Sequence, residues 1–297
     1  MSNLLIASVL SVGSAAANEP SGAVGATSLM HLAAAHAHRK ALRDEPDLRS
    51  SSVLILDATH SSVLFSRRAG VAMPIASITK LMTALVVLGA EQPLDEPIEI
   101  TRDDNLGGKG SYSRLTVGTT LSRGDLIHLA LMSSENRAAR ALGRHYPGGL
   151  SAFVPAMNAQ ARALGMTHAH FVDPAGLSSE NVASPDDLSK LVMAASQSPV
   201  IREFSTDKGY TVRSGRHVLD FRNTDSLVSN PTWDIIVQKT GYITEAGKCL
   251  VMQAVIDGRT VVIVLLDSYG KYTRVADARR IKKWMDWRLT AGLADAG

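Results

Sequence analysis

The chain has 297 residues, of which 45% are hydrophobic and 20% charged, and its net charge is +3. This length and composition suit a globular protein with one large core or two small ones, and so small a charge gives no reason to expect nucleic acid as a partner. The only cysteine, Cys249, excludes an intramolecular disulfide, and its apolar neighbours predict a buried strand residue and not a nucleophile.

The first residues have the pattern of an export signal. Residues 4–17 form an apolar run that ends in small residues, which predicts a signal peptide over residues 1–17 with cleavage after Ala17. The run is too short to span a membrane. Residues 1–3 supply none of the basic side chains that usually precede such a run. Export is therefore expected, and full-length protein in the cytoplasm would count against it.

Residues 18–46 are predicted to connect this signal to the folded domain. The segment is rich in Ala, Gly and Ser and carries His31, His36 and His38. No cysteine or acidic ligand accompanies these histidines at a fixed spacing, so we expect a solvated linker or weak helix and no metal site.

Residues 47–290 are predicted to form one domain with strands from both of its ends. Helices dominate from residue 75 to about 200, and a final helix is expected at about 274–289, before a short tail at 291–297. Because the terminal strands must pair to bury their apolar faces, we predict an α/β (α+β) fold in which helices cover an antiparallel five-stranded sheet, beside a helical subdomain. The predicted strands are residues 53–57, 63–66, 235–239, 249–256 and 260–266, with a hairpin turn at Asp257-Gly258-Arg259.

Ser77 and Lys80 form a Ser-x-x-Lys motif at the start of an apolar stretch of helical length, residues 81–88. Their spacing places both side chains on one face of the first turn. A helix N-terminus stabilises negative charge that develops on oxygen, which suits a nucleophile. The motif has two further copies, which both lie in runs that read as turns: Ser205/Lys208 and Ser268/Lys271.

Ser134 and Asn136 follow another apolar helical run, residues 124–132, so both should emerge from a helix end and face the nucleophile. The same tripeptide recurs at 179–181, after the loop signature of residues 173–177, and there it is predicted to lie in a surface loop. Ser184-Pro185 predicts the cap and first residue of a helix.

Lys239-Thr240-Gly241 occurs once, at the end of a β-branched run that predicts a strand. Gly241 has no side chain to obstruct a substrate lying along that strand. Taken alone, each motif has a structural explanation: Ser77 as an N-terminal helix residue, Ser134 and Asn136 as caps, and Lys239 as a solvated strand end. Three motifs in this order, each on a suitable element, instead favour an acyl-transfer site.

The motif set resembles that of the serine penicillin-recognising enzymes, whose acylation base is disputed. Among them, the low-molecular-mass D-alanyl-D-alanine peptidases of the S11 type fit best, since residues 73–84 and 171–177 resemble family signatures. Residues 131–139 and 239–252 are similar to the penicillin-binding protein 7 type of D-alanyl-D-alanine endopeptidase. The likeness covers roughly residues 47–290 and implies a β-lactamase or transpeptidase-like fold.

The resemblance implies a role for each motif residue. Ser77 would attack the carbonyl between two D-residues and form an acyl-enzyme. Lys80 would be the base, held neutral by burial and by a second cation, Lys239. Ser134 would relay a proton to the leaving amine. The remaining groups would bind substrate: Asn136 its backbone, Lys239 and Thr240 its carboxylate, Gly241 the strand beside it, and the Ser77 and Tyr242 N–H groups the oxyanion.

The implied substrates are peptidoglycan stem peptides, with β-lactams as covalent inhibitors and no cofactor. The implied location is the periplasm, and a stable membrane anchor is not expected because the chain ends soon after the last helix. The endopeptidase likeness favours cleavage of cross-links over D-alanyl-D-alanine carboxypeptidase activity. Tyr242 and the 102–116 loop are expected to shape that choice.

Two further alternatives remain. A class A β-lactamase would share the first and third motifs, but the Glu-x-x-Leu-Asn pattern that activates its deacylating water is missing here. A peptidoglycan-binding protein without activity would explain the resemblance too, although every nucleophile, base and relay residue is present. Rapid nitrocefin turnover would indicate the first, and any peptide product would exclude the second.

Overall fold

A computed structural model of the chain describes residues 45–105, 113–215 and 217–294. The predicted signal peptide, nearly all of the predicted linker with its three histidines, and the middle of the 102–116 loop lie outside the described residues.

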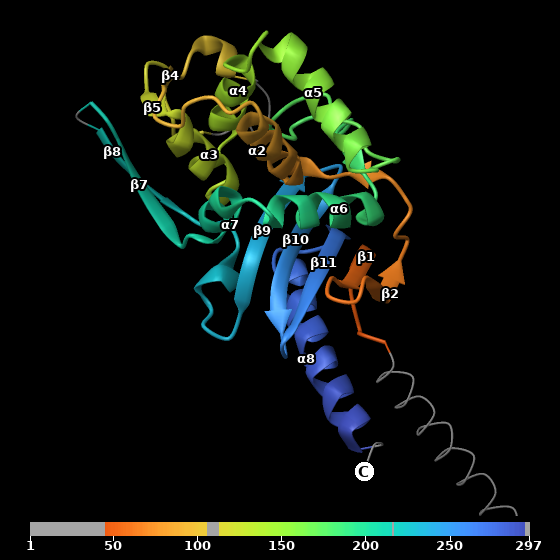
Figure 1. Cartoon of the computed structure of the whole chain (residues 1–297). Coiled ribbons are helices and arrows are strands. Elements are labelled where there is room, and N and C mark those ends of the chain that lie inside the picture. The colour runs from red at the N-terminus through yellow and green to blue at the C-terminus, as the bar shows by residue number, and fades with distance from the viewer. Residues whose placement is uncertain (1–44, 106–112, 216, 295–297) are drawn as a thin grey trace, which may run out of the picture. The chain divides into compact units, whose positions relative to one another are not determined.

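The centre of the fold is a five-stranded antiparallel sheet in the order β2-β1-β11-β10-β9 (Figure 1). As predicted, the two ends of the domain pair, with Ser50 opposite Ser268. The predicted turn between the last two strands is also confirmed, since Asp257 and Gly258 have φ angles of 50° and 76°, which a two-residue hairpin turn requires. The strands are β1 Ser50–Asp57, β2 Ser62–Arg67, β9 Asp234–Ile243, β10 Gly247–Ile256 and β11 Arg259–Ser268.

Helices flank this sheet, and α2 lies among the others as a mostly buried helix. Ser122 and Ser184 cap α3 and α6, each accepting from the N–H of an aspartate three residues on, so the predicted cap at Ser184 is confirmed. The helices are α2 Thr79–Gly89, α3 Arg123–Met132, α4 Asn136–Arg144, α5 Leu150–Ala163, α6 Pro185–Ser196, α7 Pro199–Thr206 and α8 Thr273–Ala294, with 3-10 turns η1 Ala76–Ile78, η2 Arg102–Asp104 and η3 Ser226–Ser229.

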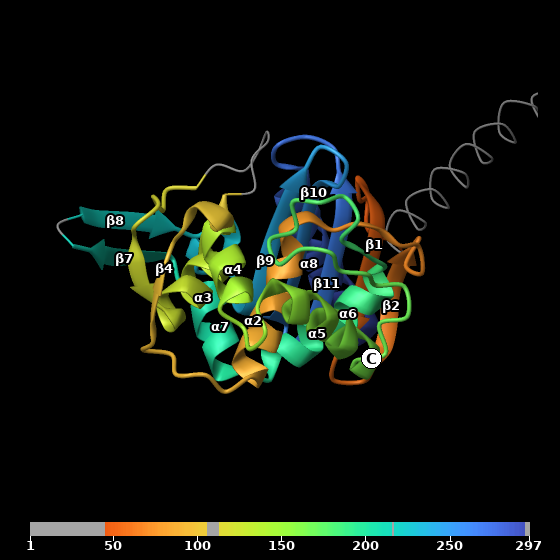
Figure 2. The same ribbon diagram turned by 90° about the horizontal axis from the view of Figure 1, so that it is seen from above.

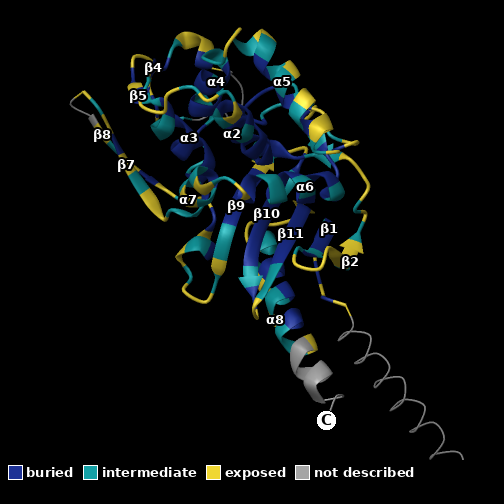
Figure 3. Cartoon of the chain, viewed as in Figure 1, coloured by how far each residue is buried: buried dark blue, intermediate teal, exposed yellow. Residues whose placement is uncertain are grey.

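Side-chain alternation along the central strands divides the core in two. Leu54 and Val251 belong to a cluster that includes the residues of α2 and α6, whereas Val53 and Leu250 belong to a cluster with α8. Figure 1 shows α6 in front of the sheet and α8 behind it. Because both faces are covered, β10 and β11 are almost continuously buried (Figure 3). Cys249 is one of these buried strand residues, as predicted, and burial raises the pKa of its thiol to about 11.

A hairpin that the sequence analysis did not predict projects beside α3 and α7 (Figures 1 and 2). Its strands are β7 Gly209–Ser214 and β8 His217–Arg222. Ser205 and Ser268, both predicted to lie in turns, are instead a buried residue of α7 and the buried last residue of β11, so both predictions are wrong. The α8 helix also runs five residues beyond its predicted end. The remaining short strands pair as β3 Met73–Pro74 with β6 Val182–Ala183, and β4 Pro97–Glu99 with β5 Thr120–Ser122.

Across the described ranges, none of the helices has a stretch long and apolar enough to cross a bilayer.

Candidate active site

Ser77 lies in the 3-10 turn η1, directly before α2. The turn begins at Ala76, whose φ of 49° is unusual for a residue with a side chain. Two glycines pack against it. A Cβ on Gly176 would lie 2.0 Å from the Ala76 carbonyl oxygen, and one on Gly241 would lie 2.9 Å from the Ile75 carbonyl oxygen and 3.2 Å from the Ser77 nitrogen. Gly241 is therefore required for the contact between β9 and this turn, a reason that the sequence did not reveal.

Lys80 is completely buried beneath the Ser77 hydroxyl. Its Nζ lies 2.8 Å from Ser77 Oγ, 2.8 Å from Asn136 Oδ1 and 2.5 Å from the Ala175 carbonyl oxygen. The last two are oxygens that only accept hydrogen bonds, whereas the hydroxyl can also donate. A neutral amine has two N–H donors and one lone pair, so it fits these partners with its lone pair toward Ser77. The predicted pairing of Ser77 with Lys80 is thus present in the structure.

The environment of Lys80 lowers its pKa to about 7. Burial is the main cause, because the ammonium form loses its hydration, while the carboxylates of Asp173 and Glu135 act in the opposite direction. Lys239 also is fully buried, and its pKa falls well below the ordinary value through burial and repulsion from Lys80. Lys80 and Arg274 are thus the cations that lower the pKa of Lys239. The expected effect of burial on Lys80 is therefore present, whereas Lys239 is not among the causes that lower the pKa of Lys80.

The Ala175 carbonyl is held in place by a turn built around Asp173. The Asp173 carboxylate accepts hydrogen bonds from the N–H groups of Ala175 (2.7 Å), Gly176 (2.7 Å) and Ser178 (2.9 Å). It also accepts one from the Asn181 side-chain amide at 2.5 Å. The prediction that residues 179–181 form a surface loop is wrong for Asn181, which is fully buried because it completes this turn.

The second motif follows the end of α3, as predicted. Ser134 has a φ of 62°, so the chain turns sharply there and Asn136 begins α4. Glu135 between them accepts hydrogen bonds from the Ser113 hydroxyl (2.5 Å) and the Arg114 N–H (2.9 Å). The second motif therefore also anchors the end of the 102–116 loop.

Ser134 lines a hollow of about 210 Å³. Among the described residues, the Lys80 amine is hydrogen-bonded to Ser77, Asn136 and Ala175, and not to Ser134. The unpredicted hairpin contributes Phe221 and Arg222 to this hollow, and the Arg114 guanidinium lies 4.6 Å from the Phe221 ring centre. The proton-relay role of Ser134 stays a prediction.

The third motif lies within β9, which continues past it. Lys239 Nζ donates to the Thr240 carbonyl oxygen at 3.0 Å. The Thr240 and Thr224 hydroxyls are 2.7 Å apart, and the Thr224 N–H donates to the Met132 carbonyl oxygen at 3.1 Å, which joins β9 to the end of α3. Tyr242, the next residue after the motif, is 57% exposed.

Arg274, from the start of α8, is a site residue that the sequence analysis missed. Its Nη1 donates to the Gly241 carbonyl oxygen at 3.4 Å. Arg274 also repels Lys239, so a second cation stands beside the third motif. No motif marks it, and 33 residues separate it from Gly241.

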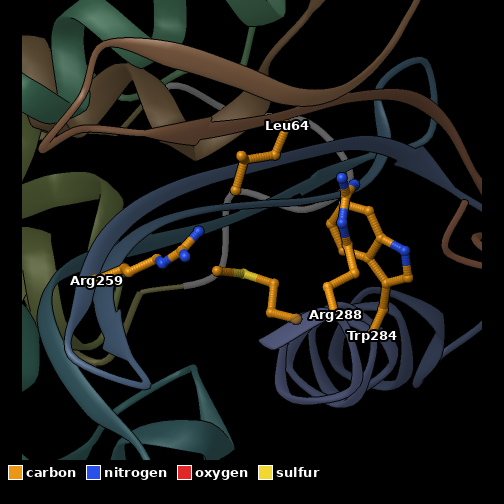
Figure 4. Close-up of a pocket in the computed structure, with 5 residues that line it drawn as sticks. Leu64, Arg259, Trp284 and Arg288 are labelled. Atoms are coloured by element: carbon orange, nitrogen blue, oxygen red, sulfur yellow. The ribbon is translucent and has the colours of Figure 1, made fainter. Parts of the chain in front are cut away.

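A separate hollow of about 220 Å³ lies on the α8 side of the sheet (Figure 4). It is lined by Leu64, Arg259, Trp284, Met285 and Arg288, and contains no residue of the three motifs. The residues of the three motifs therefore lie apart from this hollow.

Comparison with known proteins agrees with this site. The sequence profile of the peptidase S11 family, described as D-alanyl-D-alanine carboxypeptidase, matches residues 39–270. The chain is 48% identical to a D-alanyl-D-alanine endopeptidase of Pseudomonas aeruginosa and 46% identical to one of Escherichia coli. Each alignment spans 244 residues, 82% of this chain and 79% of the relative.

The fold also is similar to solved structures. The Streptomyces K15 DD-transpeptidase matches with a TM-score of 0.76 and 27% identity, over 81% of this chain and 98% of that one. Profile, sequence relatives and fold agree, and the profile match includes all three motifs. The chain belongs to the peptidase S11 family.

Proposed function

We propose that the protein is a serine D,D-peptidase that hydrolyses peptidoglycan cross-links through an acyl-enzyme. The observation that carries the proposal is the 2.8 Å contact between Lys80 Nζ and Ser77 Oγ in a fully buried setting. Burial favours the neutral amine, which is the form that can accept the Ser77 proton.

In acylation, Ser77 Oγ attacks the carbonyl carbon between two D-residues while its proton passes to Lys80 Nζ. The C–N bond then breaks, and the leaving amine receives a proton from the Lys80 ammonium through Ser134. In deacylation, water attacks the ester carbon and gives one proton to Lys80. The ester bond breaks, Ser77 regains its proton, and the stem peptide leaves with a new carboxylate.

Binding groups surround this centre. The N–H groups of Ser77 and Tyr242 would hold the oxyanion, because the contact of Gly241 with η1 brings the two segments together. Lys239, Thr240 and Arg274 would hold the carboxylate of the leaving residue. The Asn136 side chain would bind the substrate backbone after the hydrogen bond from Lys80 Nζ to Asn136 Oδ1 is released.

Cross-link cleavage is favoured over carboxypeptidase activity by the names of the two relatives above 45% identity, both endopeptidases. Carboxypeptidase activity is the second candidate, because a Streptomyces carboxypeptidase is 30% identical over 240 residues. Covalent inhibition by β-lactams, the signal peptide over residues 1–17 and a periplasmic location belong to the same proposal.

The test uses the mature protein with cross-linked muropeptide dimers and, separately, pentapeptide monomers, followed by liquid chromatography and mass spectrometry. We expect dimers to be converted to monomers. Loss of one alanine from pentapeptides with intact dimers would make the protein a carboxypeptidase and keep the mechanism. No product from either, with continued binding of stem peptides, would indicate a binding protein.

The pH dependence of acylation should report Lys80. Its pKa of about 7 means that the neutral base predominates above pH 7 and the ammonium form below. We expect the rate constant for penicillin acylation to fall about tenfold for each pH unit below about 6 and to level off above 7. Stopped-flow measurement from pH 5 to 8 checks this, and a rate that is flat over that range would contradict Lys80 as the base.

A further inference from the structure

A group of lysines and tyrosines lies where β9 leaves the catalytic centre; all are exposed except Lys248, which is half-buried. Lys248, on β10, is directly opposite Tyr242 in the strand register, and its Nζ lies 3.9 Å from the centre of the Tyr242 ring. Lys271 lies between β11 and α8, with its Nζ 5.2 Å from the centre of the Tyr272 ring. We call Tyr242, Lys248, Lys271 and Tyr272 the exit platform.

The exit platform is continuous with the third motif. Tyr242 follows Gly241 directly, and Arg274, two residues after Tyr272, donates to the Gly241 carbonyl oxygen. Lys248 is close enough to Arg274 and Lys271 that burial and repulsion from these two cations lower its pKa. Lys248, Lys271 and Arg274 are therefore close enough together to produce one region of positive electrostatic potential.

The buried Asp225 carboxylate attracts Arg274, but in the described part of the chain Lys248 and Lys271 have no acidic partner at ion-pair distance. Among the described residues, no carboxylate lies within 4.0 Å of Lys248, Lys271 or Arg274. Glu245, in the turn between β9 and β10, and Asp267, near the end of β11, are exposed and form no ion pair with them. Like charges held together without a partner favour binding of an anion.

The direction in which a substrate would lie along β9 indicates which of its anionic groups reaches these lysines. With the leaving carboxylate at Lys239 and Thr240 and the reacting carbonyl at the Ser77 and Tyr242 N–H groups, the acyl part of the substrate must continue past Tyr242. It then reaches the exit platform. A stem peptide carries free carboxylates on this side of the scissile bond, on its γ-linked glutamate and its diamino acid.

We propose that Lys248 and Lys271 form a subsite for a free carboxylate on the acyl-side stem peptide of the substrate. The inference rests on the proposed function for the direction of binding. It makes these two lysines specificity-determining residues, which distinguish stems with free carboxylates from stems in which those groups are amidated.

The binding test measures the dissociation constant of a tetrapeptide stem by ¹H–¹⁵N NMR titration, with its glutamate and diamino-acid carboxylates either free or amidated. For the unmodified protein we expect the free form to bind about tenfold more tightly, as two partly exposed charge-assisted contacts allow, and the preference to shrink as salt is raised from 50 to 500 mM. In the double variant Lys248→Gln/Lys271→Gln the two stems should bind within about twofold of each other.

Lys283→Gln is the matched control, because Lys283 is an exposed lysine on α8, about two and a half turns beyond Arg274. It should keep the preference. Equal affinity for both stems in the unmodified protein, or a preference that persists in the double variant, overturns the subsite.

A second measurement keeps this result separate from the proposed function. The same two stem types are built into the acyl side of cross-linked dimers, and kcat/KM is measured for the unmodified protein and the double variant. The ratio of free to amidated substrate should fall about tenfold in the double variant. If no dimer is cleaved while the NMR preference is present and depends on the two lysines, the cross-link activity fails and the carboxylate subsite stands.

Discussion

Ser77→Ala is expected to lower cross-link hydrolysis by about 10⁴-fold or more and to abolish covalent labelling by penicillin. Without Oγ the Lys80 amine has no hydroxyl to deprotonate, and no acyl-enzyme can form. Labelling with fluorescent penicillin, followed by gel electrophoresis and intact-protein mass, measures the loss directly. Labelling at the unmodified rate would show that another residue is the nucleophile.

Ser205→Ala is the matched control for that variant, because Ser205 begins a second Ser-x-x-Lys sequence. Its hydroxyl donates to the Arg202 carbonyl oxygen at 3.2 Å, and its own carbonyl accepts from the Gln238 side chain at 2.6 Å. These bonds make Ser205 a structural residue that joins α7 to β9. Its variant should be labelled at the unmodified rate.

Lys80→Met should have the second largest effect, a decrease of about 10²- to 10⁴-fold in the acylation rate constant. Methionine keeps an unbranched side chain in the buried position but supplies no base. Lys80→Arg separates basicity from charge, because guanidinium stays protonated at any pH used. We expect both variants to be slow, measured by stopped-flow acylation with thermal melting as the check on folding.

The arginine variant decides between two roles for Lys80. If it acylates within about threefold of the unmodified protein, the positive charge and not the base is what Ser77 needs, and the proton must go elsewhere. If only Lys80→Met folds, it still tests whether Lys80 is the base. Its acylation rate constant should no longer decline below pH 7.

The parts of the fold that were predictable depend on short-range pattern. Runs of apolar and β-branched residues identified the strands, Asp257-Gly258 identified a hairpin turn, and Ser184-Pro185 identified a helix start. Both copies of Ser-Glu-Asn were visible, yet only the structure shows that Asn181 is buried. Its burial depends on the partner Asp173, and polar loop residues carry no local sign of such a partner.

The site was predictable to the same degree. Three residues of separation on a helix implied that Ser77 and Lys80 meet, and they do. The approach of Arg274 to Gly241, the Glu135 contact with the 102–116 loop and the β7–β8 wall depend on contacts between distant segments, which periodicity cannot supply. The roles of the site residues and the domain limits stay predictions.

The two glycines that pack against η1 limit where the active site can change its shape to fit a ligand. Gly176 and Gly241 leave no space for even a methyl group, so the wall that carries Ser77 is rigid and closed to substitution at both positions. The hollow beside Ser134, which Arg114 and Phe221 line, is instead formed in part by a loop end and a projecting hairpin. We therefore expect substitutions that change ligand preference without loss of catalysis to be tolerated around this hollow and not at the two glycines.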